Sequence, residues 1–169
     1  MKKLLYVLAM LTFTLNVAQT TKSYKLPISL MIQYAQNDFK DILGDKVESI
    51  PDLESAYYQP KEIIGIGSES LIKSDNSDKT FYICSALLLS EHTSQFIEDA
   101  LKVVNDGVQA GKFSGRDYTD EKGRSITEVY QKDSDVVIRL ISSYYKDADD
   151  DNNTFSMMIY GNTLGKMMK

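Results

Sequence analysis

Residues 80–89, TFYICSALLL, place the strongest constraint on the fold, because apolar side chains occupy both sets of alternating positions in this run. Strands whose two faces are both buried have near-continuous apolar sequences of this kind. Such a strand lies in the interior of a sheet, with other strands on either side. We therefore expect residues 80–89 to form a central strand.

Four further segments have the composition of strands. Residues 62–72 are rich in β-forming residues but contain Gly65 and Gly67, which predicts a bulge or a sheet edge there. The other three segments alternate or mix apolar and polar residues in short runs. These predicted strands are residues 126–132, 135–146 and 154–160.

Two segments carry apolar residues at spacings of three and four, which is the pattern of one face of an α-helix. The face of the first comprises Ile28, Met31, Ile32, Ala35, Phe39 and Ile42. The face of the second comprises Phe96, Ile97, Ala100, Leu101, Val104 and Val108. Pro27 suits the first turn of the first helix, and Gly44 suits its end. For the second helix, Thr93 or Ser94 could cap the start and Gly111 the end.

The predicted order is helix, strand, strand, helix, strand, strand, strand. Helices interspersed with hairpins indicate an α+β fold, in which two amphipathic helices pack on a largely antiparallel sheet. Residues 71–81 and 144–155 each join two predicted strands through a tip rich in Asp, Asn and Ser, which suggests a diverged helix–hairpin repeat. Since no low-complexity linker divides residues 19–169, we predict a single domain there.

The N-terminus has the pattern of an export signal. Lys2 and Lys3 precede an apolar run, residues 4–15, and the small residue Ala18 marks a cleavage site. As a helix this run spans only about 18 Å at ~1.5 Å per residue, against a hydrocarbon core of ~30 Å. We predict a signal peptide over residues 1–18, a mature chain without a transmembrane anchor, and a periplasmic or secreted bacterial protein.

Charge argues against nucleic acid as a partner. The chain has 19 Lys and Arg against 24 Asp and Glu, and loss of Lys2 and Lys3 leaves 17 basic residues and a net charge of −7. Such a balance repels phosphate backbones. The single cysteine, Cys84, excludes an internal disulfide and a cysteine-based metal cluster. Its apolar surroundings predict a buried hydrophobic residue rather than a reactive thiol.

The acidic segment YYKDADDDNNTF, residues 144–155, comes closest to a metal-binding motif. Asp147, Asp149 and Asp151 occupy positions 1, 3 and 5 of an EF-hand-like loop, where carboxylates could converge on calcium. Position 6 is Asn where the loop requires Gly, and position 12 is Met where it requires Glu. Because Asp and Asn also suit hairpin tips, both a calcium site and a solvated turn remain open.

Three other features suggest chemistry only in part. The glycines of GIGSES, residues 65–70, resemble a phosphate-binding loop, but the pattern continues as a strand where such a loop requires a helix. His92 is the only histidine and lies near Ser90, yet the chain has no Gly-x-Ser-x-Gly motif and too few ligands for zinc. Asp38 and Asp41 share a helix face opposite the apolar one, where we expect ordinary solvated carboxylates.

The chain has 11 tyrosines, including the pairs Tyr57–Tyr58 and Tyr144–Tyr145. Tyrosine is enriched in recognition surfaces, and it also packs well within sheets. The tyrosines could therefore form a binding surface or belong to the sheet interior.

The sequence from residue 80 to the end carries a resemblance to a known family. FYICSALLLSEHTSQFIEDALKVV gives a strand followed by a helix, GRDYTDEKGR an aromatic strand and a charged turn, and YGNTLGKMMK a Gly-Asn pair before a Leu/Lys-rich end. In these features residues 80–169 resemble an uncharacterised family of small exported bacterial proteins, a domain of unknown function. The resemblance implies export and a compact α+β domain, and no site residues.

Taken together, the sequence contains no complete catalytic constellation. We predict an exported, non-enzymatic binding or interaction domain of the cell envelope, without a cofactor. Its partner would be a protein or an envelope component, recognised through sheet edges and tyrosine-rich surfaces. The alternative is a calcium-binding or small-molecule-binding protein that uses the acidic hairpin tips.

Overall fold

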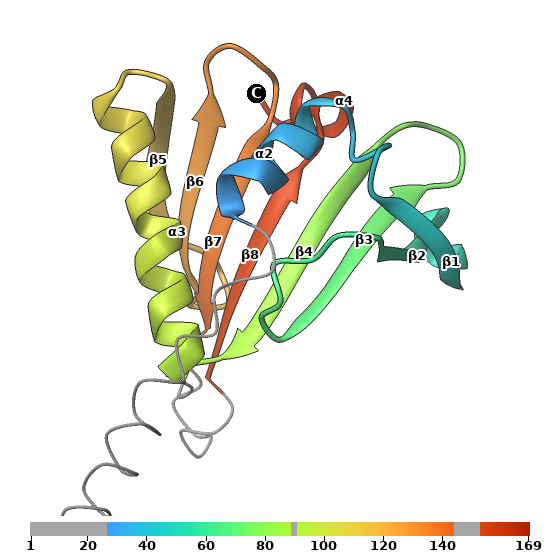
Figure 1. The fold of residues 1–169 in the computed structure, drawn as a ribbon, viewed down its shortest axis with the longest axis horizontal. Coiled ribbons are helices and arrows are strands. Elements are labelled where there is room, and N and C mark those ends of the chain that lie inside the picture. The colour runs from blue at the N-terminus through green and yellow to red at the C-terminus, as the bar shows by residue number, and fades with distance from the viewer. Residues whose placement is uncertain (1–26, 89–90, 144–152) are drawn as a thin grey trace, which may run out of the picture.

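The computed structural model describes residues 27–88, 91–143 and 153–169. Eight strands form one sheet in the order β1-β2-β3-β4-β8-β7-β6-β5 (Figure 1). The strands are β1 (Leu43–Ile50), β2 (Ser55–Pro60), β3 (Ser68–Ser74), β4 (Thr80–Leu87), β5 (Phe113–Thr119), β6 (Ser125–Gln131), β7 (Val137–Ser143) and β8 (Thr154–Tyr160). The helices in the described residues are α2 (Ile28–Gln36), α3 (Glu91–Gln109), α4 (Asn162–Gly165) and a short 3₁₀ helix (Pro51–Leu53).

Every neighbouring pair of strands is antiparallel. In chain order, α2 is followed by β1 to β4 and α3 by β5 to β8, so each of the two longer helices precedes a four-stranded meander. The two meanders meet where β4 pairs with β8, from Phe81 opposite Tyr160 to Leu87 opposite Thr154. The apolar run that begins at Thr80 is therefore a central strand, as its sequence predicts.

The predicted fold class is wrong. The protein is dominated by one eight-stranded antiparallel sheet, rather than by two helices packed on five strands in the order helix-strand-strand-helix-strand-strand-strand. The prediction misses β1, β2 and β5. The suggested helix–hairpin repeat is also wrong, because each of the two longer helices is followed by four strands and not by a two-stranded hairpin. β1 and β5 are the two edges of the sheet. No residue of β1 and only Phe113 of β5 is buried, so neither sequence shows the apolar alternation of a packed strand.

The first helix is shorter than predicted. α2 ends at Gln36, because Asp38 and Phe39 have φ values of 51° and 58°, in the left-handed region that ends a helix. Gly44 lies in β1 and does not stop the helix. A Cβ at Gly44 would be 2.1 Å from the backbone oxygen of Gln59, so the close approach of β2 requires glycine there.

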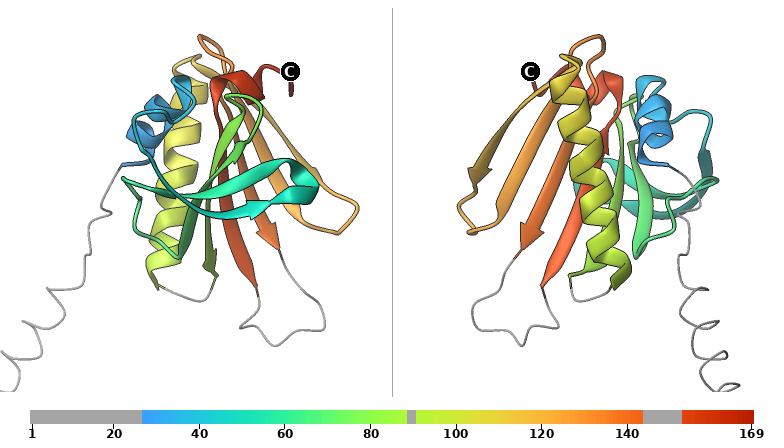
Figure 2. Two further views of the ribbon diagram at one scale, coloured as in Figure 1. Left: turned by 90° about the vertical axis from the view of Figure 1, so that its right-hand side faces the viewer. Right: turned by 60° about the vertical axis from the view of Figure 1, so that its left-hand side comes forward.

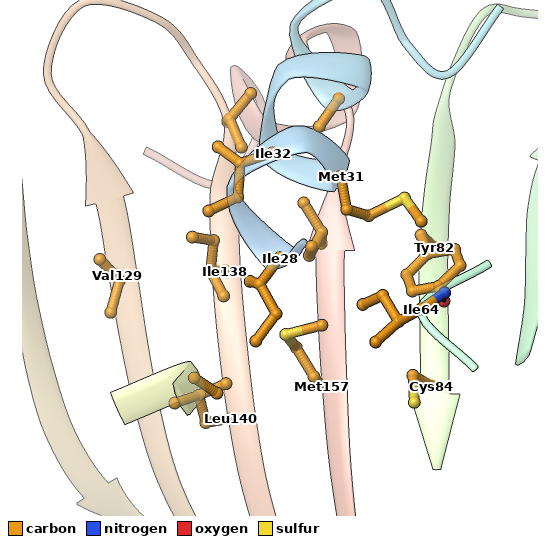
Figure 3. Close-up of a cluster of buried hydrophobic side chains, with 14 of the residues drawn as sticks. Ile28, Met31, Ile32, Ile64, Tyr82, Cys84, Val129, Ile138, Leu140 and Met157 are labelled. Carbon is orange, nitrogen blue, oxygen red and sulfur yellow. Dashed lines mark hydrogen bonds between the residues drawn. The ribbon is translucent and has the colours of Figure 1, made fainter. Parts of the chain in front are cut away.

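The hydrophobic core lies between the sheet and the two longer helices. α2 and α3 are on the same side of the sheet in each view of the molecule (Figures 1 and 2). Figure 3 shows side chains from α2, β4, β6, β7 and β8 gathered in this core. Phe96 of α3 meets Phe155 of β8 edge to face, with ring centroids 5.8 Å apart. Burial of each large apolar side chain of this kind stabilises the fold by roughly 1.5–3 kcal/mol.

The opposite side of the sheet carries neither α2 nor α3 (Figure 2), and we call it the open face. Successive side chains of a strand point to opposite faces, so the residues that alternate with the core residues belong to it. α4 lies at one end of this face, beside Asp135 and Val137. The larger open-face side chains are Tyr57, Ile72, Phe81, Ile83, Arg116, Tyr118, Ile126, Glu128, Tyr130, Arg139, Ile141, Met158 and Tyr160.

Within the described ranges, none of the helices combines the length and the apolar character that crossing a membrane requires.

Candidate functional site on the open face

A row of charged residues crosses three strands of the open face. Arg116 of β5 is opposite Glu128 of β6, and Glu128 is opposite Arg139 of β7. Directly opposed residues in antiparallel strands have Cβ atoms about 5 Å apart. The strand register therefore places one carboxylate between two guanidinium groups.

The carboxylate of Glu128 is bonded through both oxygens. Oε1 accepts hydrogen bonds from Arg116 Nε at 3.1 Å and Nη2 at 2.9 Å, and also from the hydroxyl of Tyr130. Oε2 accepts a hydrogen bond from Arg139 Nε. These neighbours cover Glu128, whose side chain is only 1% exposed, while that of Arg116 is 65% exposed. Glu128 is thus a buried anion on the sheet face that carries neither α2 nor α3 (Figure 2).

Two opposing effects act on the pKa of Glu128. Burial raises it, but hydrogen bonds from Tyr130, Arg139 and Arg116 lower it by more, so the pKa is held below its ordinary value. The hydrogen bond to Glu128 in turn raises the pKa of Tyr130. At neutral pH the site is an ionised carboxylate between two cations, with a net charge of +1.

Aromatic rings hold both arginines in place. The guanidinium of Arg116 lies 5.2 Å from the ring centroid of Tyr118, and that of Arg139 lies 5.3 Å from the centroid of Tyr160. Tyr160 also accepts a 3.3 Å hydrogen bond from Arg139 Nη1. Stacking of this kind restricts the guanidinium groups before any ligand binds. We call the set Arg116, Tyr118, Glu128, Tyr130, Arg139 and Tyr160 the Glu128 cluster.

A shallow, open surface pocket of about 340 Å³ adjoins the cluster and shares Tyr130 with it. Lys169 closes one side, where its Nζ donates to the backbone oxygens of Gln131 at 3.3 Å and Ser134 at 2.7 Å, and to Asp135 Oδ1 at 3.1 Å. The cavity, which we call the Lys132 pocket, is lined by Ser114, Tyr130, Gln131, Lys132 and Lys169.

Comparisons with models of protein families, with curated proteins and with solved structures found no match. The resemblance of residues 80–169 to a family of exported proteins stays a prediction. Any function assigned to the site therefore depends on its geometry and chemistry.

The candidate calcium ligands Asp147, Asp149 and Asp151 lie outside the described residues, as do Tyr144 and Tyr145. Calcium binding at that tip stays a prediction. In the parts of the chain that the structure describes, no three His, Cys, Asp or Glu side chains are grouped as metal ligands would be.

The other acidic tip joins β3 to β4 as a hairpin turn, and its carboxylates are paired with lysines. Asp78 lies 2.9 Å from Lys40 and 3.9 Å from Lys73, and Asp75 lies 3.7 Å from Lys46. These surface ion pairs compete with a cation for the same oxygens. Of the two proposed acidic tips, this one is therefore poorly suited to metal binding.

The glycine-containing segment does bind an anion, but the anion is a side chain of the same protein. The backbone N–H groups of Ile64, Gly65 and Ile66 donate to the Glu69 carboxylate at 2.8, 2.6 and 2.6 Å. Tyr82 donates its hydroxyl to the same carboxylate. Residues 61–67 are a loop on the core side and not the start of a strand, so the predicted bulge or edge at this position is wrong.

Cys84 is buried, as its sequence context predicts. Its Sγ donates to the backbone oxygen of Ile66 at 2.9 Å, and burial raises the pKa of the thiol. The thiol therefore stays protonated and is a poor nucleophile. His92 lies in the first turn of α3, which begins at Glu91, and Ser90 lies outside the described residues.

Asp38 and Asp41 do not share a helix face, since both follow the end of α2. Asp38 accepts hydrogen bonds from the backbone N–H of Thr163 at 2.8 Å and from its hydroxyl at 2.7 Å, and so joins α4 to the segment after α2. Asp41 is exposed and accepts a 3.2 Å hydrogen bond from Asn37. The expected solvated surface holds for Asp41, whereas Asp38 is half-buried and bonded to Thr163.

The Glu128 cluster was not predicted, although the sequence carries a signal for it. VVIRLI and SITEVY each contain a single charged residue, Arg139 and Glu128, in the middle of a predicted strand. The short turn between these two strands would pair the opposite charges across a hairpin. Arg116 gave no such signal, because the strand to which it belongs was not predicted.

Proposed function

We propose that this chain is an exported, non-enzymatic binding protein that recognises a partner protein of the cell envelope through its open face. The observation that carries the proposal is the row Arg116–Glu128–Arg139. Burial of such an ionic group costs desolvation energy, and apolar residues of similar size often stabilise a fold as well or better. A rigid ionic row on a face that carries neither α2 nor α3 (Figure 2) is therefore better suited to recognition than to stability.

The electrostatics of the row favour binding over acid–base catalysis. A general acid or base works best when its pKa is near the operating pH. Here the pKa of Glu128 is lowered and the pKa values of Tyr130, Arg116 and Arg139 are raised, in each case away from neutrality. Each group keeps one charge state at neutral pH, as a recognition surface requires.

Export is part of the proposal because of the signal sequence predicted over residues 1–18, which lies outside the described residues.

The surroundings of the row suit a protein partner. Tyr57, Phe81, Ile83 and Met158 provide apolar and aromatic area on the same face, and Tyr57 is exposed. Aromatic residues, methionine and arginine are enriched in protein interfaces.

The test compares matched variants in capture from an envelope extract of the producing cells. Met158→Glu places a carboxylate in the same cross-strand row, next to Arg139. Leu101→Glu places one on the surface of α3, where Leu101 is 40% exposed. We expect the wild type and Leu101→Glu to capture the same partner, and Met158→Glu to lose it, with all three proteins folded by circular dichroism. Equal capture by Met158→Glu would refute recognition through the open face.

A further inference from the structure

The backbone of β5 has hydrogen-bonding groups on two sides, and only one side has a partner strand. The N–H of Lys132 donates to the oxygen of Lys112 at 2.9 Å, and the N–H of Asp120 donates to the oxygen of Arg124 at 3.1 Å. Opposed residues of an antiparallel pair alternate between hydrogen-bonded and non-hydrogen-bonded pairs. The even-numbered residues of β5 therefore bond to β6, and the odd-numbered residues direct their N–H and C=O groups away from it. These outward residues are Phe113, Gly115, Asp117 and Thr119.

The outward groups form a free edge of the sheet. β5 is the last strand in the sheet order. In the part of the chain that the structure describes, no other segment forms a hydrogen bond with the outward N–H and C=O groups. Gly115, Asp117 and Thr119 are also exposed. A row of alternating free donors and acceptors along an exposed strand is a template on which another strand can pair.

The two edges of the sheet are not equally suited to pairing, because bulges and charged side chains block an edge strand. The pairing of β1 with β2 shifts register on both sides of Lys46, whereas that of β5 with β6 is continuous. Both charged side chains of β5 are directed to β6. Arg116 binds Glu128, and Asp117 accepts a 2.6 Å hydrogen bond from the hydroxyl of Thr127. β5 is therefore the edge that can accept a further strand.

A second copy of β5 is a poor occupant of this edge. Antiparallel pairing of the whole strand with itself would place Phe113 opposite Thr119, and Arg116 directly opposite Arg116 of the other copy. Like charges directly opposite each other destabilise a strand pair. Shifted registers pair fewer residues, with Asp117 opposite Asp117 in one and Gly115 opposite Gly115 in the other. A strand of different sequence avoids these oppositions.

We propose that an extended, β-forming segment of the partner protein adds to β5 as a further strand of the sheet. Its backbone binds the outward N–H and C=O groups, so the main chain provides the affinity. Alternate side chains of the added strand lie on the open face beside Arg116 and Tyr118, which are on that face. On the core side Gly115 has no side chain and leaves room for a β-branched residue. This inference rests on the proposed binding function and specifies how the partner is held.

The first experiment uses a capped heptapeptide of alternating Thr and Val, which is uncharged. Calorimetric titration should show binding that changes little with salt. In the free protein the amides of Arg116 and Tyr118 should exchange with deuterium more slowly than those of Gly115 and Asp117. With free peptide at about ten times its dissociation constant, exchange at Gly115 and Asp117 should slow about tenfold, because only free protein exchanges. Unchanged exchange at these two amides would refute strand addition.

Asp117→Pro and Asp117→Ala form a matched pair of variants. Both lose the carboxylate, but only the proline lacks the outward N–H, and edge strands tolerate proline where the N–H faces solvent. We expect Asp117→Ala to bind the peptide as the wild type does, and Asp117→Pro at least about fivefold more weakly, as loss of one hydrogen bond predicts. If Asp117→Pro does not fold, Thr119→Pro and Thr119→Ala make the same comparison. Equal affinity of the proline and alanine variants would refute the edge as the site.

Capture from envelope extract separates this inference from the proposed function. Loss of one partner by both Met158→Glu and Asp117→Pro, with retention by Asp117→Ala, is the expected result. A partner lost by Met158→Glu and held by Asp117→Pro would retain recognition through the open face and refute strand addition. A partner lost by Asp117→Pro alone would do the reverse. Sedimentation of the protein alone should show a monomer, and a dimer that Asp117→Pro dissociates would assign the edge to a second copy and refute the partner strand.

Discussion

Two carboxylates occupy opposite faces of the same sheet, and they are stabilised by different kinds of donor. Glu69 of β3 is on the core side and accepts three backbone N–H groups from the loop 61–67, together with the hydroxyl of Tyr82. Glu128 of β6 is on the open side, and among the described residues its hydrogen-bond donors are the side chains of two arginines and a tyrosine.

The difference in hydrogen-bond donors indicates the role of each carboxylate. Backbone N–H groups stabilise an anion without adding a net charge, and their positions are fixed by the chain. Glu69 therefore organises a loop over the core. Guanidinium groups add two positive charges for the single negative charge of Glu128, and the excess remains on an open surface. We infer a structural role for Glu69 and a recognition role for the cluster around Glu128.

The largest expected effect tests the structural role. Glu69→Ala would leave the N–H groups of Gly65 and Ile66 and the hydroxyl of Tyr82 without their acceptor, and the N–H of Ile64 with only its 3.4 Å hydrogen bond to Tyr82. We expect the free energy of unfolding in urea to fall by about 3 kcal/mol, since each unsatisfied buried polar group costs about 1–3 kcal/mol. Glu62→Ala provides the control, because Glu62 belongs to the same loop and is exposed.

Formate offers a second measurement of the same site. If the loop forms an anion site, formate should raise the melting temperature of Glu69→Ala more than that of the wild type. A Glu69→Ala protein as stable as Glu62→Ala would show that these hydrogen bonds contribute little, and the contrast with Glu128 would fail.

The next effect tests the recognition role. Glu128→Leu removes the anion that separates two cations, but Arg116 is 65% exposed and Arg139 30% exposed, so water can solvate them in part. We expect a loss of about 2 kcal/mol in the free energy of unfolding, less than the roughly 3–5 kcal/mol found when a fully buried ion pair is broken.

A triple variant separates stability from recognition. In Arg116→Met, Glu128→Leu and Arg139→Met combined, no charge is left unpaired, and apolar replacements of ionic groups are often neutral or stabilising. We expect its stability to return to within about 1 kcal/mol of wild type while capture of the partner is lost. A triple variant that remains as unstable as Glu128→Leu would mean that the cluster is needed for folding, and the comparison would lose its basis.

The sequence predicted the elements that pack on the core more successfully than the rest of the sheet. β4 and β8 were found because tertiary packing imposes alternation or continuous apolar character on them, as in Phe155, Met157 and Ile159. β1 and β5 are edge strands, with the sequences LGDKVESI and FSGRDYT. Most of their side chains are exposed or half-buried. β1 and β5 are strands because they form hydrogen bonds with β2 and β6. This pairing cannot be predicted from the sequence of the edge strand alone.

The candidate site could be predicted only in part for a related reason. A charge at the centre of an apolar strand, as at Arg139, indicates a buried partner, and the hairpin register points to Glu128. The contribution of Arg116 depends on the pairing of β5 with β6, and the contribution of Tyr160 depends on the pairing of β7 with β8, which brings distant residues together. The amide site around Glu69 could not be predicted from glycines alone, because it depends on the course of the loop.

The smallest expected effect is the pH dependence of the contribution that Glu128 makes to the free energy of unfolding. Its folded-state pKa lies below the unfolded value of about 4.3, so its ionised form stabilises the fold above that pH. The stabilisation is lost as the pH falls below about 4.3 and through the folded-state pKa. Glu128→Gln is a fixed analogue of the protonated form and does not titrate. At pH 7 we expect wild type to be more stable than Glu128→Gln by about 1 kcal/mol, the difference between charged and neutral hydrogen bonds.

Urea unfolding of both proteins between pH 7 and pH 3 measures this difference directly, because the other carboxylates titrate alike in the two proteins and cancel. The advantage of wild type should be constant above pH ~5 and should decrease toward zero at lower pH. A wild-type advantage over Glu128→Gln that persisted unchanged at pH 3 would mean that the arginines do not lower the pKa of Glu128.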